Sequence, residues 1–452
     1  MSNLSKDLFF LEYFKEYGNS IAIIWKNQYI SYQYILERIE HWESKIRTLR
    51  PNSIVGLEGD FSPETISILY GLIRNNTIVV PFDLNHMEKN QKKYEIAELD
   101  YLIRIYDEDN IEFIEMNFIT KEKNNLFKKL IDQNNPGLLL FTSGSSGTPK
   151  AALHDFSKLL SKFRIKRKAL RTINFLLFDH WGGLNTLFHI MSNGGAVVIL
   201  ENRTPDYVCE LIEKHQVELL PTSPTFLNML LISRAYERYS IDSLQLISYG
   251  AEPMPESLLT KLNTLFPKIV FQQTYGLIEL GVMRSKSEAK GSLWVKIGGE
   301  GYAVRVVEGM LQIKSESAML GYLNAPSPFT EDGWFMTGDA VEVNGDYFKI
   351  LGRKSELINV GGEKVYPQEV ENVILELPEI SDVLIYGDSH PFTGKIVCAK
   401  IKYQGSKSNA EIINIVKSYC RTKLESFKVP IKIQVVDESF ESDRFKKSRV
   451  KW

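Results

Sequence analysis

Residues 142–150 read Thr142-Ser143-Gly144-Ser145-Ser146-Gly147-Thr148-Pro149-Lys150 and directly follow the apolar run 138–142. Such a run predicts a buried β-strand, so the loop begins where a strand ends. The two glycines permit positive φ angles and a close approach of the backbone to a ligand. The hydroxyl groups and the Lys150 cation suit a polyphosphate, although a plain Ser/Gly turn would also be polar. The loop is not a Walker A motif, because Lys150 is followed by Ala151 and not by Ser or Thr.

Around this loop, short apolar runs alternate with longer amphipathic stretches. The runs predict strands at 77–81, 138–142, 196–200 and 244–248, and the stretches predict helices at 205–215 and 225–239. Alternation of strands and helices is typical of α/β layers built on parallel sheets. The sequence therefore predicts a large, multi-layer α/β domain in the N-terminal part of the chain.

The pattern changes after about Gly291, where segments become shorter and turn pairs frequent. Asn344-Gly345 between two β-branched runs predicts a β-hairpin over 341–350. After Arg353 a compact α+β pattern follows, with strands predicted at 356–360, 383–386, 396–401 and 431–436 and helices at 367–377 and 410–423. We therefore expect two parts, residues 1–352 and residues 353–452.

Composition excludes several classes of protein. The chain has 452 residues, 54 Lys plus Arg and 56 Asp plus Glu, so its net charge of −2 argues against a dedicated nucleic-acid binder. No apolar run is long enough to span a membrane, and the N-terminus lacks the pattern of a signal peptide. Cys209, Cys398 and Cys420 form neither a disulfide framework nor a zinc site by their spacing, which predicts buried free thiols and a cytoplasmic protein.

The loop resembles the phosphate loop of the adenylate-forming superfamily, which includes acyl- and aryl-CoA synthetases, adenylation domains of nonribosomal peptide synthetases and firefly luciferase. Further matches occur in the family's order and spacing from about residue 20 to the C-terminus. They are His180-Trp-Gly-Gly-Leu184, Gly250-Ala-Glu-Pro253, Tyr275-Gly-Leu-Ile-Glu279, Thr337-Gly-Asp339, Gly352-Arg353 and the segment 359–371.

The resemblance implies a fold and a chemistry. The fold is α/β: a large multi-layer N-terminal domain with parallel-type sheets and a distorted β-barrel region, followed by a small mobile α+β domain. The chemistry is attack of a carboxylate on the α-phosphorus of ATP, giving acyl-AMP and pyrophosphate, after which a thiol displaces AMP. Mg²⁺ and fixed cations lower the repulsion between the two anions. The implied partners are a small carboxylic acid and either coenzyme A or the phosphopantetheine of an acyl or peptidyl carrier protein, with no nucleic acid and no membrane span.

By the same resemblance, Glu279 holds Mg²⁺, Tyr275 stacks on the adenine, and Asp339 and Arg353 bind the ribose. The full set of residues implied to bind ATP is Thr142, Ser143, Gly144, Ser145, Ser146, Gly147, Thr148, Lys150, Gly250, Ala251, Glu252, Tyr275, Gly276, Asp339 and Arg353. On the plainer interpretations, Tyr275 is a core aromatic, Glu279 is a surface acid and Asp339 is a turn residue.

His180 takes the place of a histidine that acid:CoA ligases keep near the carboxylate, although a lone His beside Trp181 also suits a core position. The preceding Phe178-Asp179 pair is similar to one in amino-acid adenylation domains, so an amino substrate stays possible. The acid pocket is expected to be walled by scattered positions around His180, 222–226, Tyr249 and 273–276. Trp181 and Tyr249 would suit an aryl or modest-sized acid.

The C-terminal part carries two expected catalytic elements. A gapless count from Val436-Asp-Glu438 gives Lys446 as the lysine that bridges carboxylate and α-phosphate, with Lys447 as an adjacent competitor. Gly361, Gly362, Glu363 and Lys364 resemble the loop that enters the site for thioester formation, after rotation about 353–355. An ordinary Gly-Gly hairpin is the plainer interpretation of this loop.

Three positions depart from the family pattern: Ile278 lacks a hydroxyl that normally touches the α-phosphate, Ser355 occupies the hinge, and Phe445 replaces a glycine. One lost hydrogen bond is worth roughly 0.5–1.5 kcal/mol, too little to forbid the reaction. The sequence therefore favours an ATP-dependent acid:CoA ligase. A ligase that delivers the acyl group to a carrier protein, and a degenerate binding protein without turnover, stay open.

Overall fold

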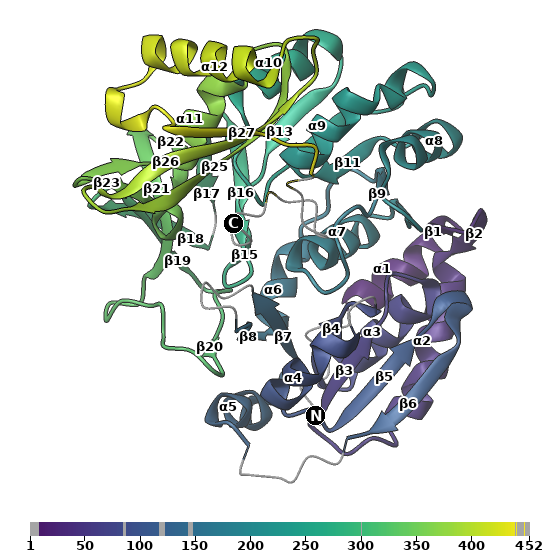
Figure 1. Ribbon diagram of the computed structural model, residues 1–452. Helices are drawn as coiled ribbons and strands as arrows, with labels where there is room; N and C mark the ends of the chain where they lie inside the picture. Colours follow the sequence, from purple (N-terminus) through teal and green to yellow (C-terminus); the bar gives the residue numbers. More distant parts are fainter. Residues whose placement is uncertain are drawn as a thin grey trace.

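The structure is a computed structural model that describes residues 9–84, 87–116, 123–142, 148–299, 301–438, 440 and 447. Two seven-stranded sheets form the N-terminal part (Figure 1). The first has the order β13 (Val270–Gln273), β12 (Leu246–Tyr249), β11 (Leu219–Thr222), β9 (Arg171–Ile173), β10 (Ala196–Val198), β1 (Ile21–Trp25) and β2 (Gln28–Ser31). Its pairs are parallel except for the β1–β2 hairpin.

The second sheet carries the strands on either side of the glycine-rich loop. Its order is β20 (Gly321–Tyr322), β8 (Lys150–Asp155), β7 (Gly137–Thr142), β4 (Ile78–Phe82), β3 (Ile54–Glu58), β5 (Tyr101–Ile105) and β6 (Ile111–Glu115). The central strands β7, β4, β3 and β5 run parallel, whereas β8 folds back antiparallel to β7. Helices α4 (Met87–Ala97) and α5 (Asn125–Gln133) pack on this sheet.

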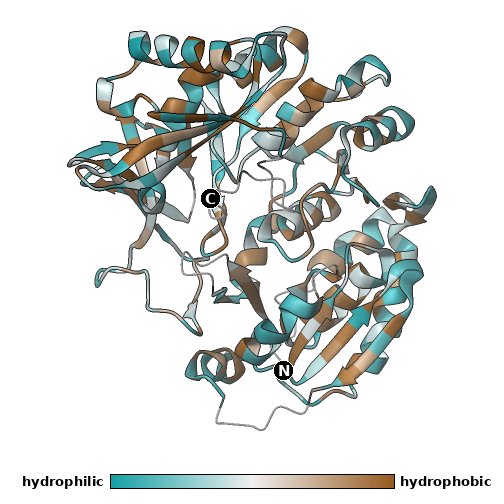
Figure 2. Cartoon of the chain, in the orientation of Figure 1, coloured by the Kyte–Doolittle hydropathy of each residue, from teal (hydrophilic) through white to brown (hydrophobic). Residues whose placement is uncertain are grey.

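Helices fill the space between the two sheets and cover the outer face of the first. The core between the sheets combines their side chains with those of α1 (Phe9–Tyr17), α2 (Tyr32–Ile46), α3 (Pro63–Arg74), α6 (Phe156–Leu160) and α7 (Trp181–Ser192). The outer face of the first sheet packs against α8 (Pro205–His215), α9 (Pro224–Ser233) and α10 (Glu256–Leu265). Figure 2 shows this arrangement as hydrophobic strands and helices with hydrophilic outer faces.

The third sheet is antiparallel and is the distorted β-barrel region that the resemblance implies. Its order is β16 (Arg284–Ser287), β17 (Val295–Gly298), β22 (Tyr347–Arg353), β21 (Phe335–Asn344), β19 (Met310–Ser315) and β18 (Tyr302–Val307). The short hairpin of β14 (Gly276–Leu277) and β15 (Gly281–Val282) joins it to the first sheet. Its core includes Tyr275, so the barrel contributes to the expected nucleotide site.

The C-terminal part is an α+β unit. Its sheet has the order β24 (Glu363–Val365), β23 (Ile358–Val360), β26 (Gly394–Tyr403) and β25 (Ile380–His390), with β27 (Lys432–Val435) beside β26. One face of this sheet packs against α11 (Pro367–Ile374) and α12 (Asn409–Lys423). The first residue of the predicted C-terminal part, Arg353, ends β22 of the barrel sheet, and the next strand belongs to this new sheet. In Figure 1 the unit is drawn in green and yellow, with α12 at the top of the view.

Most predicted elements are confirmed with shifts of a few residues, and the fold class is confirmed. The clearest difference is at α9, which ends at Ser233 and not near Tyr239. Arg234 adopts a left-handed conformation with φ 54°, and this ends the helix before a separate 3₁₀ turn at Ala235–Glu237. The three cysteines are free and buried, as expected. Of the helices within the described ranges, none combines the length and the apolar character that crossing a bilayer requires.

Candidate active site

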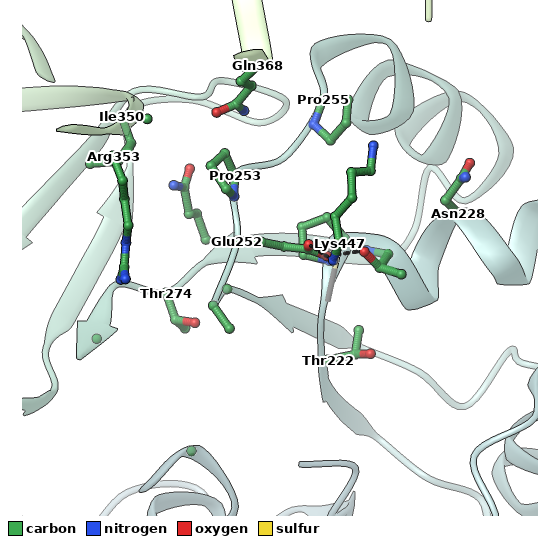
Figure 3. A pocket seen from close by; sticks show the side chains of 18 of the residues that line it. Thr222, Asn228, Glu252, Pro253, Pro255, Thr274, Ile350, Arg353, Gln368 and Lys447 are labelled. Carbon is green, nitrogen blue, oxygen red and sulfur yellow. Dashed lines mark hydrogen bonds between the residues drawn. The ribbon is translucent and has the colours of Figure 1, made fainter. Parts of the chain in front are cut away.

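One cavity of about 1260 Å³ lies where the first sheet, the barrel and the C-terminal part meet (Figure 3). This volume exceeds that of a typical small-molecule pocket, so there is room for a nucleotide and a second ligand. Eleven of the expected site residues line it, namely Thr142, Lys150, His180, Gly250, Ala251, Glu252, Tyr275, Gly276, Glu279, Asp339 and Arg353. The fold thus gathers residues that lie far apart in the sequence.

The strands flanking the glycine-rich loop place its two ends side by side. Thr142 at the end of β7 and Lys150 at the start of β8 are direct partners in the antiparallel ladder, and both line the cavity. Residues 143–147, which are five of the expected phosphate ligands, lie outside the described residues. Thr148 is exposed and is not among the residues that line the cavity, so its expected role stays a prediction.

Asn324, which the sequence analysis missed, holds the backbone on both sides of Lys150. Its Oδ1 accepts a hydrogen bond from the Ala151 N–H at 2.9 Å, and its Nδ2 donates to the Pro149 carbonyl at 2.9 Å. Tyr322, two residues earlier, pairs with Ala152 in the sheet. These contacts fix the direction in which the lysine leaves the strand.

Glu279 and Lys150 meet at the ring of Tyr322. The Tyr322 hydroxyl donates to Glu279 Oε1 at 2.5 Å, and Lys150 Nζ lies 5.4 Å from the centre of the Tyr322 ring. Burial, together with the nearby Glu279 charge, raises the pKa of Tyr322, which keeps its hydroxyl a donor. Glu279 is therefore a carboxylate oriented by Tyr322, the residue whose ring Lys150 also approaches.

This donor set fits Mg²⁺ that is held mainly by phosphate oxygens. Mg²⁺ at nucleotide sites is usually bound through one or two protein carboxylates plus substrate phosphates and water. Within the described ranges no group of three or more His, Cys, Asp or Glu side chains could hold a metal ion, so no all-protein cage is present there. Glu279 would hold the ion when ATP supplies the remaining oxygens.

The loop after β12 approaches the loop after β13 very closely. A Cβ atom on Gly250 would lie 2.5 Å from Thr274 Oγ1 and 2.7 Å from the Thr274 carbonyl oxygen, so glycine is required there. Ala251 has φ 69°, a conformation that costs a non-glycine residue roughly 1–2 kcal/mol. The strained turn presents Glu252, whose Oε1 accepts from the Thr225 N–H at 2.7 Å at the start of α9.

Asp339 is a buried hydrogen-bond acceptor in the wall of the cavity. Its side chain accepts from the Tyr275 hydroxyl at 2.5 Å and lies 3.3 Å from Arg353 Nε, its ladder partner on β22. Burial raises the pKa of Asp339, and the Arg353 charge and the Tyr275 hydroxyl oppose that shift. Tyr275 is buried, as the plainer interpretation of a core aromatic also requires, yet it lines the cavity.

His180 lines the cavity at the start of α7 and also caps that helix. Its Nδ1 accepts from the Gly182 N–H at 3.1 Å, so the proton of the neutral ring is on Nε2. A Cβ atom on Gly183 would lie 2.3 Å from the Leu177 carbonyl oxygen, which explains the second glycine of the motif. Trp181 also lines the cavity, whereas Tyr249 is buried and is not among the residues lining it. Ser248 and Gly250, on either side of Tyr249, do line the cavity, so an acid-pocket wall around this position stays a prediction.

The C-terminal part lines the cavity with Lys447 and with residues of α11 and β25, such as Gln368 and Ser381, and not with the Gly361 hairpin. The backbone N–H of Lys447 donates to Glu252 Oε2 at 3.0 Å, and the residue lines the cavity. Lys364 is exposed and does not line it, nor does Gly361 or Gly362. Lys446 lies outside the described residues, so its role stays a prediction.

Comparison with known proteins places this geometry in a family. The family profile described as "AMP-binding enzyme" matches residues 10–323, and the profile "AMP-binding enzyme C-terminal domain" matches residues 369–447. The chain belongs to the AMP-binding enzyme family. It is 27% identical over 338 residues to an indoleacetate–CoA ligase of Aromatoleum aromaticum, with 67% of this chain and 64% of the relative covered. A 2-succinylbenzoate–CoA ligase of Bacillus velezensis is 29% identical, with 66% and 64% covered.

Relatives and solved structures of similar length also exist. A putative long chain fatty acid–CoA ligase, VraA, of Staphylococcus epidermidis is 22% identical over 97% of this chain and 95% of its own length. The crystal structure of the anthranilate CoA ligase AuaEII with anthranoyl-AMP has a TM-score of 0.82 at 18% identity, covering 97% of this chain and 95% of its own. ATP-bound MatB from Rhodopseudomonas palustris has a TM-score of 0.81 at 20% identity and 96% coverage of both chains. These structures confirm the fold.

Several of the curated relatives are matched over only part of their length. The matched region spans 64% of the indoleacetate–CoA ligase and 60% of a trans-cinnamate:CoA ligase of Petunia hybrida, less than two-thirds of either relative. Family membership therefore gives this chain the adenylate-forming fold, while the roles of its site residues, its acid and its acyl acceptor are matters of proposal.

Proposed function

We propose that this protein adenylates a carboxylic acid with ATP and then transfers the acyl group to the thiol of coenzyme A. The observation that carries the proposal is the cavity that joins Lys150, Glu279 and Asp339 to His180 at the start of α7. The Lys150 cation and the Glu279 carboxylate suit the triphosphate and its Mg²⁺. The buried Asp339 carboxylate suits the ribose diol, from which it can accept hydrogen bonds. The remaining wall beside His180 gives the acid a place in the same cavity.

The two steps balance without a further reactant. In the first, a carboxylate oxygen attacks the α-phosphorus, and the bond from that phosphorus to the pyrophosphate oxygen breaks. In the second, the thiol sulfur attacks the acyl carbon, the bond to the AMP oxygen breaks, and the thiol proton is lost. The first step brings two anions together, so fixed positive charge should supply most of the catalysis. Lys446 and Lys150 are our candidates for that charge, with Mg²⁺ on Glu279.

We propose that the two parts of the chain have separate roles in the reaction. Residues 1–352 form the core with the ATP and acid pockets. Residues 353–452 rotate about 353–355, so that Lys446 serves adenylation and the loop of Gly361 to Lys364 serves thioester formation. The Gly361–Gly362 turn is a two-residue hairpin away from the cavity, while Lys447 lines it, and this contrast supports an arrangement suited to the first step.

A carrier-protein acceptor is the alternative, because the thiol of phosphopantetheine is chemically the same as that of coenzyme A. Release of AMP that depends on coenzyme A and needs no carrier would favour coenzyme A as the acceptor. A binding protein without turnover is a third possibility, motivated by Ile278, Ser355 and Phe445. Ile278 does line the cavity, so its methyl groups replace a hydroxyl at the site itself.

Exchange of pyrophosphate into ATP tests the first step. We expect exchange with at least one acid of a panel containing indoleacetate, anthranilate, succinylbenzoate, malonate and octanoate. Lys446→Ala should abolish this exchange yet spare thioester formation from supplied acyl-AMP. If ATP binds but no acid supports exchange, the protein is a binding protein and the proposal is wrong.

A further inference from the structure

Lys447 directs its side chain into the C-terminal part, where Glu371 and Asp382 line the same cavity. Its Nζ donates to the Val383 carbonyl at 2.8 Å and lies 3.0 Å from Asp382 Oδ1 and 3.9 Å from Glu371 Oε2. We call Glu371, Asp382 and the Val383 carbonyl the acidic notch. The Lys447 side chain is 14% exposed, so the ion pair is largely shielded from solvent.

The acidic notch is a rigid part of the fold. Glu371 lies on α11, and its Oε1 accepts from the Ile385 N–H of β25 at 3.0 Å. Asp382 lies on β25, and its Oδ1 accepts from the Val383 N–H at 2.8 Å. Both carboxylates are buried, and a buried carboxylate without a cation is strongly unfavourable. The acidic notch therefore needs a cation, and the Lys447 ammonium group supplies it.

The backbone of the same residue is held by the N-terminal part. The Lys447 N–H donates to Glu252 Oε2, while the other oxygen of Glu252 accepts from Thr225 at the start of α9. Figure 3 shows Glu252 and Lys447 side by side at the cavity wall. A second contact between the two parts lies nearby, since Asn228 Nδ2 donates to the Ser381 carbonyl at 3.0 Å. Lys447 thus links the acidic notch to the loop after β12, which carries Glu252.

We infer that Lys447 is a positioning residue that holds the C-terminal part against Glu252 for adenylation, while the bridging role stays with the proposed Lys446. This inference rests on the proposed function. The Lys447 ammonium is committed to the notch, so it does not serve as the bridging cation. The notch contacts lie within the C-terminal part, whereas the contact to Glu252 crosses between the parts. When the C-terminal part rotates for thioester formation, Lys447 should lose its contact to Glu252 and keep its contacts to the notch.

Lys447→Met tests the inference, because it keeps the length of the side chain and removes its charge. We expect pyrophosphate exchange, with the most active acid of the panel, to fall about ten- to one-hundredfold in kcat, since a misplacement of about 1 Å can cost that much. The KM for ATP and the rate of thioester formation from supplied acyl-AMP should stay within about twofold of the wild type, because uniform ligand binding is untouched. Lys447→Arg should restore most of the exchange.

Lys428→Met is the matched control. Lys428 also pairs with two carboxylates of the C-terminal part, Glu369 at 2.5 Å and Glu425 at 2.6 Å, and its side chain is 15% exposed, but it does not line the cavity. Both half-reactions of this variant should match the wild type. Equal loss of both half-reactions in Lys447→Met, unchanged exchange, or failure of arginine to restore it would each overturn the inference.

A readout that needs no turnover separates this inference from the proposed function. Amide hydrogen exchange of the peptide 440–452 in the full chain should be faster in Lys447→Met than in the wild type and in Lys428→Met. Equal protection in all three proteins would overturn the inference even if the wild type adenylates an acid. Absence of pyrophosphate exchange in the wild type, with the tail protected as expected, would instead overturn only the proposed function.

Discussion

Replacing Asp339 tests the ribose assignment on which the nucleotide site depends. The carboxylate is buried, accepts from Tyr275 at 2.5 Å and lies 3.3 Å from Arg353 Nε. A hydrogen bond to a charged group is worth about 1.5–3 kcal/mol. Since about 1.4 kcal/mol corresponds to a factor of ten, Asp339→Ala should weaken ATP binding about 10- to 150-fold for one such bond to the ribose.

Calorimetric titration with Mg·ATP, without any acid, measures this affinity directly. Asp339→Asn keeps the shape and one acceptor oxygen for Tyr275, so its affinity should lie between those of the wild type and the alanine variant. Asp346→Ala is the control, because Asp346 is exposed at the turn of the same hairpin and pairs with Lys296. Thermal unfolding of each variant checks that it is folded. Unchanged affinity in a folded Asp339→Ala protein would refute the ribose assignment.

The pH dependence of ATP binding gives a second readout of the same group. Burial raises the pKa of Asp339 above its ordinary value of 3.8. As the pH falls through the raised pKa, the carboxylate gains a proton and loses the charge that strengthens its hydrogen bonds, so affinity should fall at the acid end. Asp339→Asn cannot gain this proton, and its affinity should lack that part of the pH dependence. A parallel pH profile in the two proteins would contradict the argument.

Three further predictions concern other parts of the molecule. Gly361→Leu should spare pyrophosphate exchange and block thioester formation, because Gly361 has φ 62° and lies at the tip of the β23–β24 hairpin; equal loss of both would remove the rotation argument. Asn324→Ala should lower the exchange rate about tenfold by freeing the backbone around Lys150, worth roughly 1 kcal/mol per hydrogen bond, and unchanged exchange would show that the two bonds do not orient this lysine. Burial lowers the pKa of His154 from 6.5 to about 4. Below pH 6.5 the unfolded state therefore binds a proton that the folded state does not, and the free energy of unfolding decreases. Denaturant titration should show that lowering the pH from about 7 to about 5 costs the wild type roughly 2 kcal/mol more than His154→Leu, at about 1.4 kcal/mol per pKa unit, and equal losses would contradict it.

Local signals predicted the elements whose ends are set by the chain itself. Helix α8 has the predicted bounds, because Thr204 caps it, Pro205 occupies its first position and Gln216 ends it in a left-handed conformation. The hairpin of β21 and β22 follows from Asn344-Gly345 in the same way. The end of α9 could not be predicted, because Arg234 gives no sequence signal for a positive φ angle.

The candidate site was predictable for residues that belong to the family motifs and not for residues that only orient them. The motifs indicated Lys150, Glu279 and Asp339 by their resemblance to a family. Tyr322 and Asn324 gave no signal, because they reach the loop through the pairing of β20 with β8, two strands far apart in the sequence. The pairing of strands that lie far apart in the sequence depends on the whole fold, so no short stretch of sequence predicts it.

These long-range contacts also bear on the three departures from the family pattern. Glu279 is held by the Tyr322 hydroxyl, and Asp339 by the Tyr275 hydroxyl, so side chains of the protein itself orient both carboxylates. Groups that are already oriented need little reorganisation when charge develops, and this preorganisation dominates electrostatic catalysis. Ile278 removes at most one hydrogen bond from a site whose carboxylates are oriented independently of it. The rate of adenylation should therefore depend far more on the cations brought to the cavity than on the hydroxyl missing at position 278.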